Sequence, residues 1–302
     1  MRVKNIIRRG LLPASLAAAV SLLSACSGTS MLNTLNRSDH YRTHANLAYG
    51  EHARQTLDIY QPEENQSAQA CLVVFVYGGS WEEGRKEQYG FVGAALAKLG
   101  HTVVIPDYRL YPEVRYPAFV EDIAQAVASE PVQSRVQSRP LVLMGHSAGA
   151  MMAGLVSYNP DYLKAVGLDK SAIDAYVSLA GPHDYFLPTD KPRWTKIFGE
   201  DEERQVTALT VEHIAADNPP TLILHGADDT TVTPRSAVSL EQKLKDAGVA
   251  VTRHTYEGVD HVSLIAATAW PLRWRAPTLE DVDGFLRSQC NTAMGNNTQE
   301  AL

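Results

Sequence analysis

Gly145-His146-Ser147-Ala148-Gly149 is the most informative segment of this sequence. The pattern G-x-S-x-G is typical of a sharp turn that joins a strand to a helix and leaves the serine hydroxyl exposed. Glycine stands on both sides because a Cβ at either position would collide with the neighbouring strand or helix. The pattern alone is weak, since three fixed residues at ordinary usage occur by chance in about one chain of this length in ten.

The residues around this stretch strengthen it. Residues 140–144 read Pro-Leu-Val-Leu-Met, a short apolar run that predicts a buried strand. Residues 148–156 are small and apolar, as expected of a helix that is buried against a sheet. This is the strand–turn–helix setting that the pattern requires, and Ser147 is therefore a candidate nucleophile.

A nucleophilic serine needs a base to take its proton and an acid to orient that base. On such a turn the chain order is serine, acid, histidine. The apolar run 221–224 is followed by Asp228 and Asp229, either of which could be the acid while the other is a solvated turn residue. Only two histidines follow them. His254 lies inside the next strand pattern, whereas His261 lies in the loop after it, so we favour His261 as the base.

The oxyanion that forms during acyl transfer needs backbone N–H donors, each worth about 3 kcal/mol. The pattern supplies one donor from the residue after the serine, Ala148. The others are expected from a glycine-containing loop after an earlier strand. Residues 72–76 predict that strand, and Gly78 and Gly79 lie in the loop that follows it. A simple Gly-Gly turn is the alternative, but the position at the end of a buried strand favours oxyanion donors.

Strand and helix patterns alternate along the chain and predict an α/β fold, with a mostly parallel central sheet and helices on both faces. An opening hairpin is expected at 43–49 and 56–60. The other strands are expected at 72–76, 102–106, 140–144, 174–179, 221–225 and 251–256, and the longer helices at 88–99, 118–129, 148–158, 235–247 and 278–289. Residues 42–290 are a normal length for a single α/β domain.

The longest stretch between core strands, 182–220, predicts a small cap segment, since long connections usually carry function or short helices of their own. Its aromatic residues either line an acyl pocket or pack as local core; they are Tyr185, Phe186, Trp194 and Phe198. The sequence has no recognisable metal-ligand set and no phosphate- or dinucleotide-binding loop. We therefore expect no cofactor.

Four motifs together resemble the α/β-hydrolase superfamily, and within it the hormone-sensitive-lipase-like and Aes-type carboxylesterases. They are Tyr77-Gly-Gly-Ser-Trp81, Pro106-Asp-Tyr-Arg-Leu-Tyr-Pro112 with Tyr116-Pro-Ala-Phe-Val-Glu-Asp122, Gly145 to Gly149, and His225-Gly-x-x-Asp229-x-x-Val232. The resemblance covers about residues 42–290. It implies a triad of Ser147, Asp229 and His261, with oxyanion donors at Gly78, Gly79 and Ala148.

The resemblance has one departure. The family usually has histidine where Tyr77 stands, and that histidine supports the oxyanion loop. We expect the Tyr77 hydroxyl to replace its hydrogen bonding. Arg109 and Asp122 are expected to form an ion pair that braces the segment below the site.

These residues predict a serine carboxylesterase that hydrolyses short-chain esters of small molecules through an acyl-enzyme intermediate. An amide hydrolase with the same triad, as in the related arylformamidases or peptidases, is an alternative, although Ser80 argues against a formamidase. The alternative from another class is a non-catalytic binding protein on a hydrolase scaffold, since a fold does not determine a function. The complete triad argues against it.

Residues 1–25 look like a secretory signal peptide, because four basic residues lie near its start and the apolar run 11–23 is too short to span a membrane. Residues 23–26, Leu-Ser-Ala-Cys, resemble the bacterial lipoprotein signal. That resemblance implies cleavage before Cys26 and a lipid anchor on its thiol, with an ordinary signal peptide as the alternative. Ser27 then implies the outer membrane of the bacterial envelope. Residues 26–41 are expected to be a polar tether.

Removing residues 1–25 takes away four basic and no acidic residues, so the net charge changes from −7 to −11. This charge opposes binding to nucleic acid or anionic head groups, and membrane contact is expected through the lipid alone. The envelope permits disulfides. However, Cys71 opens a buried strand, where free cysteine is common, so we expect Cys71 and Cys290 to be unpaired. Residues 291–302 are polar and expected to be a flexible tail.

Overall fold

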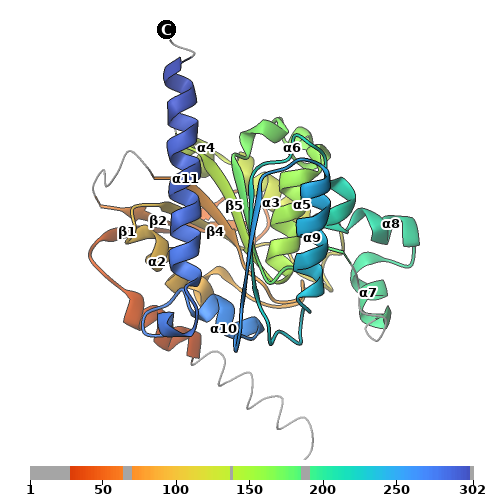
Figure 1. Cartoon of the computed structure of the whole chain (residues 1–302), viewed down its shortest axis with the longest axis horizontal. Helices are drawn as coiled ribbons and strands as arrows, with labels where there is room; N and C mark the ends of the chain where they lie inside the picture. The colour runs from red at the N-terminus through yellow and green to blue at the C-terminus, as the bar shows by residue number, and fades with distance from the viewer. Residues whose placement is uncertain (1–27, 64–69, 137–138, 185–190, 300–302) are drawn as a thin grey trace, which may run out of the picture.

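The computed structural model describes residues 28–63, 70–136, 139–184 and 191–299. They form one eight-stranded sheet in the order β1-β2-β4-β3-β5-β6-β7-β8, with helices packed around it (Figure 1). The strands are β1 Tyr41–Ala48, β2 Thr56–Pro62, β3 Leu72–Val76, β4 Thr102–Pro106, β5 Leu141–His146, β6 Ala175–Leu179, β7 Thr221–Gly226 and β8 Val251–Tyr256. Every predicted strand is therefore found, the hairpin included.

The sheet is antiparallel only at its beginning. β2 pairs antiparallel with both β1 and β4, and all the later pairings are parallel. All residues of β3 to β7 are buried, so helices cover both faces of the central sheet. Such doubly covered parallel strands read as continuous apolar runs, which is why the sequence locates them well. The predicted α/β-hydrolase fold is confirmed.

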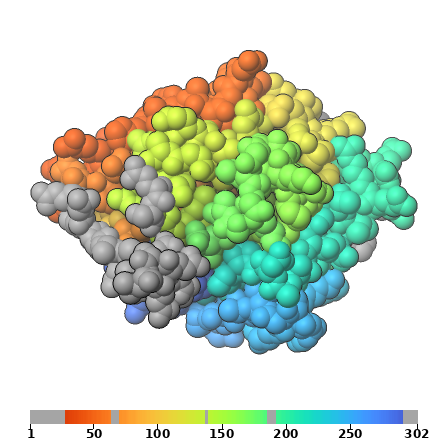
Figure 2. Space-filling model, turned by 90° about the horizontal axis from the view of Figure 1, so that it is seen from above, coloured from red at the N-terminus to blue at the C-terminus, as the bar shows by residue number. Residues whose placement is uncertain are grey.

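The helices include the five long ones that were expected and several short ones that were not. They are α2 Gly90–Ala97, α3 Ala118–Ala128, α4 Glu130–Val136, α5 Ala148–Tyr158, α6 Pro160–Ala165, α7 Lys191–Phe198, α8 Glu202–Thr207, α9 Arg235–Asp246, α10 His261–Ala266 and α11 Thr278–Gln299. The cap segment consists of α7, α8 and the 3-10 helix η4 (Thr210–His213). It is the teal part that projects at the right edge of Figure 2, which views the upper end of Figure 1.

The expected tether is wrong for residues 28–36, which form a helix that packs on the domain. Asn36 is fully buried, and its side chain donates to Trp270 O at 2.9 Å and accepts from Trp270 N at 3.1 Å. Asn33 accepts from Phe91 N at 2.8 Å. The folded unit therefore begins before residue 42. The predicted signal peptide and Cys26 lie outside the described residues.

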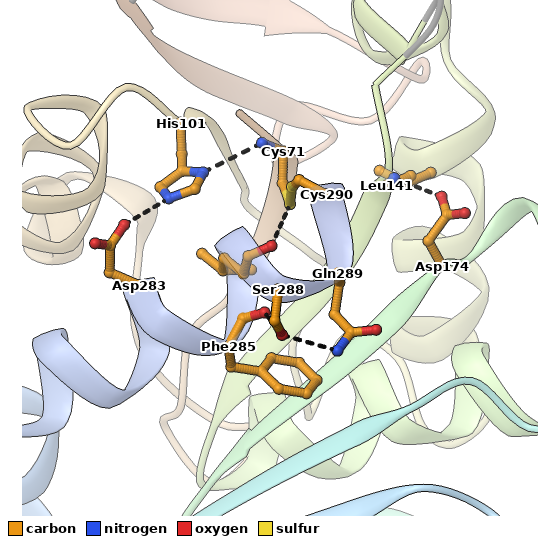
Figure 3. The surroundings of a disulfide bond; sticks show 10 residues. Cys71, His101, Leu141, Asp174, Asp283, Phe285, Ser288, Gln289 and Cys290 are labelled. Carbon is orange, nitrogen blue, oxygen red and sulfur yellow. Dashed lines mark hydrogen bonds and ion pairs between the residues drawn. A yellow bond between two sulfur atoms is a disulfide. The ribbon is translucent and has the colours of Figure 1, made fainter. Parts of the chain in front are cut away.

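The expectations for the C-terminal end and the cysteines are also corrected. α11 continues to Gln299, so a flexible tail is wrong up to that residue, and 300–302 lie outside the described residues. Cys71 and Cys290 form a disulfide with a Cα–Cα distance of 5.8 Å, rather than two free thiols. The physical reason is that α11 returns to the start of β3 and buries Cys290 against Cys71 (Figure 3).

Among the described residues, no helix is long and apolar enough to cross a membrane.

Candidate functional site

Ser147 lies on the sharp turn between β5 and α5, with φ of 56° and ψ of −127°. The turn is anchored to the next strand, since Ser147 N donates to Leu179 O at 2.9 Å. The flanking glycines are required for close approach. A Cβ at Gly145 would lie 2.3 Å from Gly149 O, and one at Gly149 would lie 2.1 Å from Val76 O. The turn therefore presents the Ser147 hydroxyl at the carboxyl end of the sheet.

The structure brings the three predicted triad residues into one hydrogen-bonded chain. His261 Nε2 lies 2.8 Å from Ser147 Oγ, and His261 Nδ1 lies 2.7 Å from Asp229 Oδ2. Asp229 follows β7, and His261 is the first residue of α10 rather than a loop residue. The side chain of Asp260 caps this helix by accepting from Val262 N and Ser263 N. These contacts hold the imidazole between the carboxylate and the hydroxyl.

Asp229, not Asp228, faces the histidine. Its side chain is buried, and its Oδ1 accepts from Thr231 N and Val232 N, both at 2.9 Å. Burial raises the pKa of Asp229, but hydrogen bonds from His225 and His261 outweigh it and hold this pKa well below its usual range. The carboxylate is therefore ionised and oriented. Asp228 is exposed, and so is His254 on β8.

His146, the variable residue of the motif, is a contact that the sequence analysis missed. Its Nε2 lies 3.0 Å from the carbonyl oxygen of His261, and the two rings are 4.9 Å apart. Burial, with the neighbouring His261, lowers the pKa of His146 to about 3. The neutral ring can therefore donate to the His261 carbonyl and help to hold the start of α10. Its position next to the serine was the only sequence signal.

The predicted oxyanion donors lie around the serine. A Cβ at Gly78 would lie 2.9 Å from Ser147 Cβ, so this loop passes directly over the turn. Gly79 has φ of +138°, and a Cβ there would lie 2.0 Å from Glu83 O. Among the described residues, no backbone carbonyl accepts from the Gly78 or Gly79 amides. Ala148 begins α5, where the first amides of a helix have no intrahelical acceptor. These three amides are available to an oxyanion.

A cavity of about 250 Å³ lies beside these groups. Gly78, Gly79 and His146 line one side of it. The rest of the lining is mostly apolar and comes from three other parts of the chain; it includes Thr29, Leu32, Tyr89, Phe91, Val262, Ile265 and Ala266. Val262, which follows His261, and the helix 28–36 therefore both border the cavity next to the candidate nucleophile.

Comparison with known proteins agrees with this geometry. The BD-FAE family model matches residues 57–244, more than half of the chain. The chain belongs to the BD-FAE family. The family places this fold within the α/β-hydrolase superfamily, as the sequence motifs implied.

The individual relatives of this BD-FAE protein share low sequence identity with it. A probable isoprenylcysteine alpha-carbonyl methylesterase of Arabidopsis thaliana is 27% identical over 241 residues, 72% of this chain and 50% of the relative. The kynurenine formamidase of Salmo salar is 33% identical over 115 residues, 38% of each chain. The solved truncated carbohydrate esterase from gut microbiota has a TM-score of 0.72 at 22% identity, over 84% of this chain and 99% of that one. This chain spans about half the length of the curated relatives it matches first.

Tyr77 makes the hydrogen bonds that were expected of it in place of histidine. Its hydroxyl donates to Asp107 Oδ1 at 2.6 Å and accepts from Arg54 Nη2 at 2.9 Å. Arg54 also donates to Gly84 O at 2.8 Å, so it ties both ends of the oxyanion loop together. Arg54 was missed because it lies between the two strands of the opening hairpin, far from any motif. The predicted ion pair of Arg109 and Asp122 is present, with Nη2 and Oδ1 2.6 Å apart.

The cap aromatics of this BD-FAE protein pack as local core where the structure describes them. Phe198 is fully buried, with its ring 5.0 Å from that of Trp81 in the oxyanion loop. The Trp194 ring lies 5.2 Å from the same indole. The cap therefore supports the oxyanion loop by packing against Trp81. Tyr185 and Phe186 lie outside the described residues. No group of three or more His, Cys, Asp or Glu side chains in the described part of the chain is placed to hold a metal ion.

Proposed function

We propose that this protein is a serine carboxylesterase that hydrolyses short-chain esters of small molecules. One observation carries the proposal: the unbroken hydrogen-bonded chain from Asp229 through His261 to Ser147, with free loop amides beside it. Membership of the BD-FAE family supports it. Several relatives and structural neighbours, which are named as esterases, support it further.

In the proposed reaction, Ser147 Oγ attacks the ester carbonyl carbon while His261 Nε2 takes its proton. The carbonyl π electrons move to the oxygen, which accepts hydrogen bonds from the amides of Gly78, Gly79 and Ala148. His261 then gives the proton to the alcohol oxygen as the C–O bond breaks and leaves an acyl-serine. Water repeats both steps and releases the acid. The Asp229 carboxylate stabilises the imidazolium that forms in each half.

The test is covalent labelling with a fluorophosphonate, followed by ester hydrolysis. We expect the full chain to be labelled at Ser147 and to hydrolyse p-nitrophenyl acetate, and Ser147→Ala to lose both properties. A folded wild-type protein that reacts with neither reagent would favour a non-catalytic binding protein instead.

Amide hydrolysis on the same triad is the second candidate. The partial similarity to kynurenine formamidase favours it, whereas Ser80 in the oxyanion loop argues against it. The discriminating measurement is kcat/KM for a formanilide against that for p-nitrophenyl acetate. A higher value for the formanilide would replace the esterase proposal.

We further propose that the protein is anchored to the bacterial outer membrane by a lipid on Cys26. The proposal rests on the resemblance of residues 23–26 to the lipoprotein signal and on Ser27 after the cysteine. Radiolabelled palmitate should enter the wild-type protein in cells but not Cys26→Ser, and the substitution should block processing or make the protein soluble. Absence of label in the wild type would contradict the lipid anchor.

A further inference from the structure

The exposed large hydrophobic side chains of the described residues are unevenly distributed. Seven are exposed, and two of these, Val206 and Val238, lie on α8 and α9. The other five lie on the helix 28–36, on α10 and on the segment that follows it. They are Met31 at 63% exposure, Leu35 at 39%, Val262 at 68%, Trp270 at 58% and Trp274 at 76%. We call these five residues the apolar face.

Direct contacts join the elements that carry the apolar face. Asn36, next to Leu35, is joined to the backbone of Trp270 by two hydrogen bonds. Arg275, next to Trp274, donates to Ser263 Oγ at 3.0 Å and so ties this segment to α10. The helix 28–36 and α10 also line the same cavity. In Figure 1 these elements lie together at the lower end of the molecule, opposite the C-terminus.

We propose that the apolar face docks on the surface of a phospholipid bilayer. Tryptophan is the residue that prefers the boundary between acyl chains and head groups, and it supplies both of the largest exposed side chains here. Arg273 and Arg275 are exposed on either side of Trp274, where they can meet lipid phosphates. Large exposed apolar groups gathered on one face of a protein mark a binding surface.

The short link between the helix 28–36 and the proposed lipid anchor at Cys26 favours a bilayer over another partner. Gly28 begins the helix of this face, and Cys26 precedes it by only two residues, which span at most about 7 Å of chain. A lipid on Cys26 would therefore hold the start of this helix close to the membrane. Because the net charge without residues 1–25 is −11, apolar insertion rather than attraction to anionic lipids drives the docking.

The docked face would also determine where the substrate enters. Val262 lines the cavity beside the oxyanion loop and is itself 68% exposed, so the apolar face borders this cavity. This consequence rests on the proposed esterase activity, whereas the choice of a bilayer rests on the proposed lipid anchor. Esters at the bilayer surface would then reach Ser147 without crossing bulk water.

The test is quenching of tryptophan fluorescence by brominated phosphatidylcholine. The full chain is reconstituted in vesicles with or without bromine on the acyl chains, and we expect the bromine to lower the fluorescence by up to about twofold, because two of the four tryptophans lie on the apolar face. Trp270→Phe with Trp274→Phe should abolish the quenching, because Trp81 is buried in the core and Trp194 lies in the cap. The matched control, Val206→Ser with Val238→Ser, removes apolar groups elsewhere and should retain it.

Equal quenching in the wild type and in the tryptophan variant, or none in either, would overturn the proposal. If the wild type is a dimer without vesicles and the tryptophan variant a monomer, and the wild type is not quenched, a second copy covers the face instead. Fluorophosphonate labelling of each variant separates the two proposals. Loss of labelling in the wild type would remove the esterase but leave the quenching result intact.

Discussion

Ser147 has a backbone conformation that residues other than glycine rarely adopt, with φ of 56°. Such a conformation costs about 1–3 kcal/mol and persists only where the surroundings enforce it. Here the enforcing contacts are the two close glycines and the hydrogen bond from Ser147 N to β6. At the residue scale, the fold therefore spends stability on exposing one hydroxyl. The neighbouring titratable groups lead to two predictions.

Asp229→Asn should lower kcat/KM for p-nitrophenyl acetate about 10⁴-fold, because an amide cannot hold the histidine in the required tautomer. Asp228→Asn should change it by less than about threefold, since Asp228 is exposed and its backbone N–H, not its side chain, donates to Val259 O. Steady-state kinetics of the two variants check this. Equal losses, or a larger loss for Asp228→Asn, would reverse the assignment of the acid.

His183 should make the stability depend on pH. It is buried between Ser178 Oγ at 2.7 Å and Thr210 Oγ1 at 3.2 Å, and burial, then His225, lowers the pKa of His183 to about 3. As the pH falls below about 6.5, His183 becomes protonated in the unfolded state but stays neutral in the folded state. The stability that the neutral ring contributes is therefore present above pH 6.5 and lost as the pH falls towards 3.

Urea unfolding at pH 7 and pH 5 measures this effect. The free energy of unfolding should fall by about 2 kcal/mol more in the wild type than in His183→Gln between these pH values. The exposed His254→Gln serves as the control and should behave as the wild type does. Parallel pH profiles for the wild type and His183→Gln would contradict the prediction.

At the scale of elements, the oxyanion loop is held from several sides. The Tyr77 ring stacks between those of Tyr89 and Tyr108, at 5.3 and 4.7 Å, while its hydroxyl reaches Asp107 and Arg54. The disulfide holds a different pair of elements, the start of β3 and α11. The contacts of Tyr77 and the disulfide therefore hold the two ends of β3, the strand that leads into the oxyanion loop.

Tyr77→Phe should lower kcat about tenfold with little change in KM, because a loosened loop loses part of its hydrogen bonding to the oxyanion. Tyr158→Phe is the matched control, since it also removes one buried hydroxyl, which lies 2.6 Å from Thr221 Oγ1 and far from the loop. Each variant should lose about 1–2 kcal/mol of stability, but only Tyr77→Phe should lose kcat. An unchanged kcat for Tyr77→Phe would show that the hydroxyl has no positioning role.

Replacing Cys71 and Cys290 by alanine should lower the free energy of unfolding by about 2–5 kcal/mol, because the disulfide closes a long loop in the unfolded chain. The two cysteines are 219 residues apart. Urea unfolding without reductant checks this, and the rate of fluorophosphonate labelling at 25 °C should stay the same. Reaction of a maleimide with both cysteines of the denatured, unreduced wild type would contradict the pairing.

At the scale of the whole molecule, a small cavity borders the oxyanion loop and the residue before Ser147. The cavity measures about 250 Å³, and the cap behind it is built from short helices that pack on the oxyanion loop. No large lid is present among the described residues. Such a molecule should discriminate substrates by size.

We therefore predict a preference for acyl chains of about two to six carbons. Each buried CH₂ adds about 0.8 kcal/mol of binding only while there is room for it, so the gain should stop after the first methylenes. The measurement is kcat/KM for p-nitrophenyl acetate, butyrate, octanoate and palmitate. A steady rise through palmitate would contradict the prediction and indicate a longer groove.

The strands, their order with the helices, and the candidate triad residues could be predicted from the amino-acid sequence. This was possible because buried parallel strands are continuous apolar runs, and because the turn at Ser147 needs glycine on both sides. The residues alone left Asp228 and Asp229 open as the acid, and resemblance favoured Asp229. Both follow the same strand, so only the path of the loop places one carboxylate against His261.

The structure of the two ends of the domain depends on contacts between distant parts of the chain. The sequence indicated a tether because residues 26–41 are polar. A helix as short as 28–36 is marginal in water by itself and is stabilised by contacts such as Asn36 to Trp270. Cys71 and Cys290 looked like free thiols because nothing local relates positions 219 residues apart. The hydrogen bonds of His146 and Arg54 were likewise invisible, since each depends on a partner from a distant element.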